Sequence, residues 1–242
     1  SIAGDGENIY FLLATFEGDS PMSIARLNLS DGSLSDLCKV DNSTFLVGAA
    51  CGKLMVKTIG GDSDTGAASP DDFYRQKHIL KAVDPATGEI TPVLDWVQDE
   101  YWALVADDSL FLLSSREGKL HLTVRDLASG SDSEYDPDPS VAEGGYVMSP
   151  SWHDGILLFD LYGGPGGDGN VHRWAYTLGT GELREIMLCD PVRGYPFQVA
   201  GSLGDKLVLQ VPRYSGSDLY SFERYEYVVC SREDYLASRL PQ

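Results

Sequence analysis

The sequence predicts an all-β fold in which one four-stranded unit is repeated, and three observations lead to this prediction. A polar turn that contains a glycine recurs between segments of β-type sequence, at Gly32, Gly88, Gly130 and Gly181. The intervals of 56, 42 and 51 residues between these glycines approach the period of about 40–50 residues of four-stranded propeller blades. No segment has the periodicity of an amphipathic helix. We therefore expect a β-propeller of about five four-stranded blades.

The first unit shows how the strands differ from one another. Residues 8–14 are apolar at nearly every position, which is typical of a strand covered on both faces, whereas residues 23–29 alternate between apolar and polar. A short outer strand is expected at 33–40, and residues 1–4 are a candidate for the first strand of the unit. Blades packed face to face explain why apolar content falls from the inner to the outer strands, because the inner strands are buried between neighbouring blades.

The later units repeat this gradient. An insertion at 60–72, rich in Gly, Asp, Ser and Ala, accounts for the longest interval between turn glycines. The expected strands are 44–50, 53–59, 78–83 and 89–96; 101–106, 109–114, 120–126 and 131–135; 145–151, 155–162, 171–178 and 182–188; and 195–202, 206–211, 219–229 and 234–240. The expected blades of this single domain are 1–40, 41–97, 98–141, 142–189 and 190–242.

Composition excludes several classes of partner. The chain of 242 residues has a formal net charge of −19, whereas a phosphate backbone is bound by clustered Lys and Arg, so nucleic acid is not an expected partner. No run of about 18 apolar residues is present, so no transmembrane segment is expected, and no signal peptide is recognised. The cysteines have no CxxC spacing, and we expect free, mostly buried thiols at Cys38, Cys51, Cys189 and Cys230.

The loops carry the functional signal. In a propeller, the loops between second and third strands and the links between blades open on one face, and here these segments are long and irregular. Such a face is how a repeat scaffold displays a binding surface. Aromatic side chains beside carboxylates and amides suit sugar rings or peptide side chains. The candidate ligand-binding residues are Asp41, Trp96, Asp99, Glu100, Trp102, Tyr146, Arg193 and Tyr195.

Motifs for other chemistry are incomplete. Residues 164–169 match GxGxxG after a strand, but another strand is expected to follow, so no helix N-terminus would hold a pyrophosphate. Residues 62–66 resemble the start of a calcium loop, but the twelfth position is Phe73 rather than an acidic residue. The four histidines are scattered over three of the expected blades. We therefore expect no cofactor and no metal ion.

Four segments carry a resemblance to a known group of proteins. They are IYFLL at 9–13, HILKAVDPATGEI at 78–90, DGILLFDL at 154–161 and EYVVCSREDYLAS at 226–238. With them the chain resembles the uncharacterised β-propeller lipoproteins of Gram-positive gut bacteria, which are broadly similar to TolB-like and quinoprotein-like propellers. The resemblance implies an extracytoplasmic protein, either secreted or tethered by a lipid anchor in a removed N-terminal region. It also implies an alternative to five blades, namely part of a ring of six to eight.

Two hypotheses for function follow. The first is a non-catalytic extracytoplasmic binding or interaction module, whose ligand is a carbohydrate, another cell-envelope component or a protein. The alternative is a glycoside hydrolase or lyase, which needs two carboxylates about 5–10 Å apart, one of them with a raised pKa. The carboxylates expected in the links between blades are Asp41, Asp99, Glu100, Glu143 and Asp190.

Overall fold

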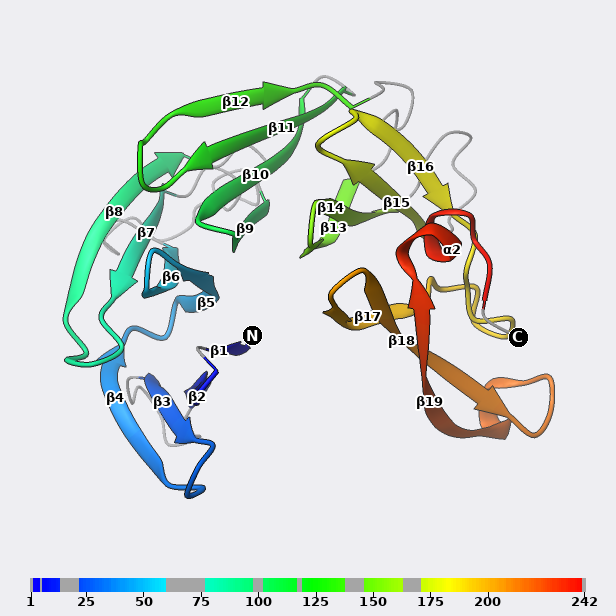
Figure 1. The fold of residues 1–242 in the computed structure, drawn as a ribbon, viewed down its shortest axis with the longest axis horizontal. Helices are drawn as coiled ribbons and strands as arrows, with labels where there is room; N and C mark the ends of the chain where they lie inside the picture. Colours follow the sequence, from blue (N-terminus) through cyan, green and yellow to red (C-terminus); the bar gives the residue numbers. More distant parts are fainter. Residues whose placement is uncertain are drawn as a thin grey trace, which may run out of the picture. The chain divides into compact units, whose positions relative to one another are not determined.

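The computed structural model describes residues 2–4, 6–13, 22–59, 77–97, 102–116, 119–137, 146–162 and 171–240. These residues form five antiparallel sheets, in each of which consecutive strands are neighbours (Figure 1). The sheets are the blades of a β-propeller, so the predicted fold class is confirmed.

Each blade is made from one continuous piece of chain. Blade 1 contains β1 (Ile2–Gly4), β2 (Asn8–Leu13), β3 (Met22–Asn28) and β4 (Leu34–Val40). Blade 2 contains β5 (Thr44–Ala50), β6 (Lys53–Ile59), β7 (Lys77–Val83) and β8 (Ile90–Val97). Blade 3 contains β9 (Trp102–Ala106), β10 (Ser109–Arg116), β11 (Lys119–Asp126) and β12 (Asp132–Tyr135). Blade 4 contains β13 (Tyr146–His153), β14 (Ile156–Tyr162), β15 (Val171–Thr177) and β16 (Glu182–Ile186). Blade 5 contains β17 (Gln198–Leu203), β18 (Lys206–Tyr214) and β19 (Phe222–Ser231).

The chain divides into two compact units. Unit 1 comprises residues 1–112 and 123–133, and unit 2 comprises residues 113–122 and 134–242. In unit 1, blades 1 and 2 share a core in which Ile24 of β3 and Leu46 of β5 are at most 1% exposed. In unit 2, β14 is buried at six consecutive positions, as expected of an apolar strand covered on both faces. Whether the five blades form one domain stays a prediction.

Blade 5 departs from the predicted pattern at its C-terminal end. The strand expected at 234–240 is wrong, because the helix α2 (Arg232–Leu236) begins this segment, and the described part of blade 5 has three strands. The side chain of Ser231 caps the helix by accepting a hydrogen bond from the backbone N–H of Asp234. Glu233 and Asp234 lie in the first turn, where carboxylates interact favourably with the helix dipole. Tyr235 is fully buried in the core between blades 4 and 5.

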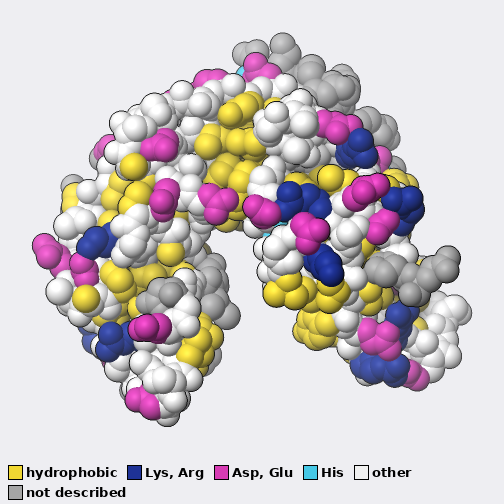
Figure 2. All heavy atoms as spheres, in the orientation of Figure 1, with side chains coloured by type: hydrophobic (Ala, Val, Ile, Leu, Met, Phe, Trp, Pro, Cys, Tyr) yellow, Lys and Arg dark blue, Asp and Glu magenta, His cyan; other side chains and the backbone are white. Residues whose placement is uncertain are grey.

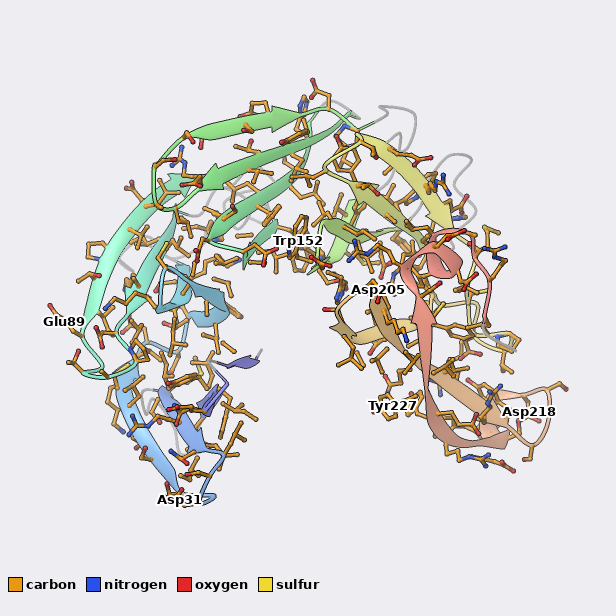
Figure 3. All side chains as sticks on the ribbon, viewed as in Figure 1. Asp31, Glu89, Trp152, Asp205, Asp218 and Tyr227 are labelled. Carbon is orange, nitrogen blue, oxygen red and sulfur yellow. The ribbon has the colours of Figure 1, made fainter. Side chains whose placement is uncertain are left out.

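Three of the predicted glycine turns share one hydrogen-bond pattern, which we call the Asx–Gly turn. It begins at Asn28, Asp84 or Asp126, whose side chain accepts the backbone N–H two residues later. The carbonyl of the same residue accepts the N–H of the glycine four residues later. That glycine has a φ of +71° to +75°, a conformation that L residues with a Cβ avoid. Figure 3 labels Asp31 and Glu89 in two of these hairpins.

The cysteine prediction is confirmed in one respect and wrong in another. All four thiols are free, but only Cys230 is buried; Cys38 is half-buried, and Cys51 and Cys189 are exposed. The exposed pair lies outside the core because Cys51 occupies the turn between β5 and β6, and Cys189 lies in the link between blades 4 and 5. In the described ranges, no helix is both long and apolar enough to cross a membrane.

Candidate binding site between blades 4 and 5

A cavity of about 310 Å³ lies between blades 4 and 5, entirely within unit 2. This volume is at the lower end of the range for small-molecule sites. Blade 4 contributes side chains from β13, β14 and β15, and blade 5 contributes residues from all three of its strands. The link between β16 and β17 supplies the rest, so two blades and their connection surround one hollow.

A buried ion pair forms one wall of this cavity. Asp160 of β14 and Arg173 of β15 are direct partners in the antiparallel register. The guanidinium donates from Nε to Oδ1 at 2.7 Å and from Nη2 to Oδ2 at 2.9 Å, and its Nη1 donates to the carbonyl of Phe197. Both side chains are about 10% exposed. Buried charges persist when they are paired and hydrogen-bonded. The hydrogen bond from Arg173 to Phe197 also links blade 4 to the segment just before β17.

His153 of β13 extends this buried polar cluster. It is 9% exposed, and its Nε2 lies 3.2 Å from Oγ of Ser151. Burial, together with the positive charge of Arg173, lowers the pKa of His153 from 6.5 to about 4, so the imidazole is neutral near pH 7. Burial raises the pKa of Tyr235 on α2, an effect that Arg173 partly offsets. Arg173 of blade 4 therefore influences the pKa of both His153 on β13 and Tyr235 on α2.

The link between β16 and β17 folds as an additional Asx–Gly turn, here between two blades rather than within one. The N–H of Asp190 donates to the carbonyl of Tyr195, and the N–H of Gly194 donates to the carbonyl of Asp190, both at 2.8 Å. Oδ1 of Asp190 accepts the backbone N–H groups of Val192 and Arg193 at 2.8 and 3.1 Å. This small hairpin holds Arg193 and Tyr195 at the cavity.

Asp190 differs from its counterparts in the other turns because it is buried. Its side chain is 7% exposed, and its Oδ2 accepts the hydroxyl of Tyr214 at 2.6 Å. Burial acts to raise the pKa of Asp190, but the hydrogen bonds from Tyr214 and the turn backbone outweigh it, and the pKa lies below its ordinary value. Asp190 is therefore a carboxylate at neutral pH, and its oxygens already have partners.

An aromatic cluster supports the side chain of Arg193. Its guanidinium carbon lies 5.9 Å from the ring centroid of Phe222, a cation–π contact. The ring of Phe222 contacts those of Tyr214 and Tyr225, with centroids 5.9 and 4.9 Å apart. Tyr195 and Tyr225, which both line the cavity, are 59% and 45% exposed. Aromatic faces open to solvent therefore stand beside a preorganised guanidinium.

The structure brings together two of the predicted ligand-binding residues, Arg193 and Tyr195. Asp41 is exposed in the link between β4 and β5, and Trp102 is 44% exposed on β9; both belong to unit 1. The backbone of Trp96 belongs to β8 and that of Tyr146 to β13.

Several other predictions fall outside the described residues. Among His, Cys, Asp and Glu in the described part of the chain, no group of three is arranged to hold a metal ion. The predictions outside this part concern Asp99, Glu100, Glu143, the calcium-loop candidate at 62–66 and the glycine-rich segment at 164–169.

The sequence analysis missed the ion pair and the additional turn, although both have a signal. Asp160 is the one charged residue within the apolar strand β14, and an acidic group there needs a partner. The pattern Asp-x-x-x-Gly of Asp84 and Asp126 recurs at Asp190. It was overlooked because Gly194 follows Gly181 by only 13 residues, which breaks the expected period.

Solved structures share this fold. TolB from Acinetobacter baumannii superposes with a TM-score of 0.58 and 13% identity, over 96% of this chain and 51% of TolB. An oligogalacturonate lyase from Vibrio parahaemolyticus gives a TM-score of 0.53 and 15% identity, over 95% of this chain and 61% of the lyase. The β-propeller domain of the Trilobed protease from Pyrococcus furiosus gives 0.54 and 12%, over 95% and 67%.

These similarities concern architecture. The chain spans about half the length of TolB and less than two thirds of the lyase. No protein-family model and no curated protein sequence matches the chain. At identities of 12–15% the solved structures carry the fold and not the chemistry. The chain is thus a β-propeller with TolB-like and other propellers among its structural neighbours.

Proposed function

We propose that this chain is a non-catalytic binding module that acts outside the cytoplasm, secreted or tethered to the membrane as a lipoprotein, and that it binds carbohydrate of the cell envelope. The cavity between blades 4 and 5 is the binding site. The observation that carries the proposal is the lining of this cavity, where exposed tyrosine rings stand beside amide and guanidinium groups. Sugar rings offer apolar faces bordered by hydroxyls, and such a lining complements both.

The carboxylates at the cavity support binding over glycoside hydrolysis. A hydrolase or lyase of the expected kind needs a protonated acid beside a second carboxylate. Asp160 is held by two hydrogen bonds from Arg173, and the pKa of Asp190 is lowered. The lowered pKa disfavours Asp190 as a proton donor near pH 7, and both oxygens of Asp160 already accept hydrogen bonds.

Saturation-transfer NMR and calorimetry with methyl glycosides of glucose, galactose and N-acetylglucosamine test the proposal. We expect at least one of these sugars to bind. Tyr195→Ala should weaken binding at least about tenfold, as expected for loss of a stacking face. Tyr220→Ala is the matched control, because Tyr220 is 99% exposed on the β18–β19 loop and does not line the cavity.

Two outcomes would overturn the proposal. One is the absence of binding to any glycoside tested, by a protein shown to be folded by its urea unfolding transition. The other is release of reducing sugar that Asp190→Asn abolishes, which would assign catalysis to the cavity.

A further inference from the structure

We propose that the carbohydrate recognised at this cavity carries a carboxylate, and that Arg193 pairs with it. This inference rests on the proposed function and names the chemical class of its ligand. The ligand would be a sugar acid, such as a hexuronic acid.

The two arginines that line the cavity differ in how their guanidinium groups are paired. Arg173 is buried and donates three hydrogen bonds, two to Asp160 and one to Phe197, so its pairing is complete within the protein. Arg193 is exposed, and its guanidinium makes no hydrogen bond to any described residue. The nearest carboxylate in the described ranges is Asp190, whose Oδ2 lies 3.9 Å from Nε, beyond hydrogen-bond distance.

Asp190 does not depend on Arg193 as a hydrogen-bond donor. Its Oδ1 accepts two backbone N–H groups of its own turn, and its Oδ2 accepts the hydroxyl of Tyr214. The pair at 3.9 Å therefore orients Arg193 without using its N–H groups. A guanidinium presents five donors in a planar fork that matches the two oxygens of a carboxylate.

The surroundings of Arg193 preorganise its guanidinium for binding. The contact with Phe222 and the hydrogen bonds of the Asx–Gly turn restrict the position of its side chain and backbone. Little conformational entropy is then lost on binding, which favours affinity. Tyr195, two residues along the same hairpin, offers a ring face to the body of the sugar.

The C-terminal part of the chain carries less net negative charge than the rest. Residues 190–242 contain seven acidic and six basic residues, whereas the whole chain contains 37 and 18. Figure 2 shows basic and acidic side chains interspersed over the elements of blade 5. Residues 190–242 are therefore close to neutral and repel an anion less strongly than the chain as a whole does.

Matched pairs of sugars test the inference. The probes are methyl β-glucuronide with methyl β-glucoside, and methyl galacturonide with methyl galactoside, measured by calorimetry on the full chain. We expect one uronide to bind about tenfold or more tightly than its neutral partner, the factor that a charge-assisted bidentate pair supplies. Arg193→Gln should abolish this difference, so that the uronide and its neutral partner bind with the same affinity, whatever the change in affinity for the neutral sugar.

Arg213→Gln is the matched control, because Arg213 is an exposed arginine paired with Glu226 and does not line the cavity. It should leave the preference for the uronide unchanged. Equal affinity for uronide and neutral sugar, or a preference that survives Arg193→Gln, would overturn the inference and leave the proposed function standing. Failure of both members of every pair to bind would overturn the inference, and the proposed function would fall with it only if the methyl glycoside of N-acetylglucosamine also failed to bind.

Discussion

Blade 3 and the junction of blades 4 and 5 both contain a two-point Arg–Asp ion pair and an Asx–Gly turn, but the two regions differ in burial. In blade 3, Arg125 forms a two-point ion pair with Asp132, with both distances 2.6 Å, and the neighbouring Asp126 begins an Asx–Gly turn. These side chains are exposed or half-buried. At the junction, Arg173 pairs in the same way with Asp160, and Asp190 begins the same turn, but Asp160, Arg173 and Asp190 are all buried.

The comparison shows that the same local hydrogen-bond geometry can contribute differently to stability, depending on whether it is buried. Both turns form the same backbone hydrogen bonds, and both Arg–Asp ion pairs have nearly the same geometry. Water screens the Arg125–Asp132 pair in blade 3, so this pair contributes little to the free energy of unfolding. At the junction, Asp160 and Arg173 are shielded from water, so removing either one leaves the other as an uncompensated buried charge. The pair also places two charged side chains in the wall of the cavity.

The largest expected effect on stability comes from removing the aspartate of each Arg–Asp ion pair. Asp160→Ala leaves the Arg173 charge buried and unpaired, and should lower the free energy of unfolding by about 3–5 kcal/mol. Asp132→Ala in blade 3 should cost less than about 1 kcal/mol. Urea unfolding followed by tryptophan fluorescence measures both.

Asp160→Ala could prevent folding altogether, so a second variant is needed. The double substitution Asp160→Leu with Arg173→Met replaces the pair by apolar groups and should recover most of the lost stability. Equal losses for Asp160→Ala and Asp132→Ala would contradict the contrast between the two regions.

A smaller effect is expected from pH. The pKa of His153 falls from 6.5 to about 4 on folding, so the unfolded chain binds the proton more readily. This contribution to stability is complete above about pH 6.5 and is lost as the pH falls toward 4, a change of about 3 kcal/mol. Unfolding free energies at pH 7.5 and pH 4 should therefore differ less in His153→Gln than in the original protein. Identical pH dependence in the two would refute the burial of a neutral imidazole beside Arg173.

The smallest effect should be equal in the two regions. Gly130 and Gly194 have φ values of +74° and +73°, and a Cβ added at either would contact no atom within 4 Å. Gly130→Ala and Gly194→Ala should each cost about 1–2 kcal/mol, because backbone strain alone opposes them. Only Gly194→Ala should weaken the binding of sugar, since only that turn borders the cavity. Unequal losses of stability by urea unfolding would show that the turns differ in more than their surroundings.

The fold was more predictable than the site because it depends on local signals. An apolar run such as β14 and a turn such as that of Asp84 are determined by neighbouring residues, and both were predicted. The helix α2 was missed although Ser231 and the two acidic residues after it form a capping signal, because a closing fourth strand was expected there.

The cavity depends on contacts between distant residues. Arg173 meets Asp160 through the register of β14 and β15, and Tyr214 meets Asp190 across 24 residues. Sequence patterns indicate that a buried carboxylate needs a donor, but they do not identify which donor. Arg193 and Tyr195 were named as separate candidates, and the additional turn is what joins them.

The outermost strand of blade 5 has a consequence for the production of this protein. In the described residues, β19 has β18 on one side and no strand on the other, and a free edge of ten residues can template intermolecular sheets. A β-bulge interrupts its pairing near Arg213 and Tyr214, and Glu223, Arg224 and Glu226 place charges along the edge. These features oppose amyloid-like stacking while the chain is concentrated, refolded or newly released from the ribosome.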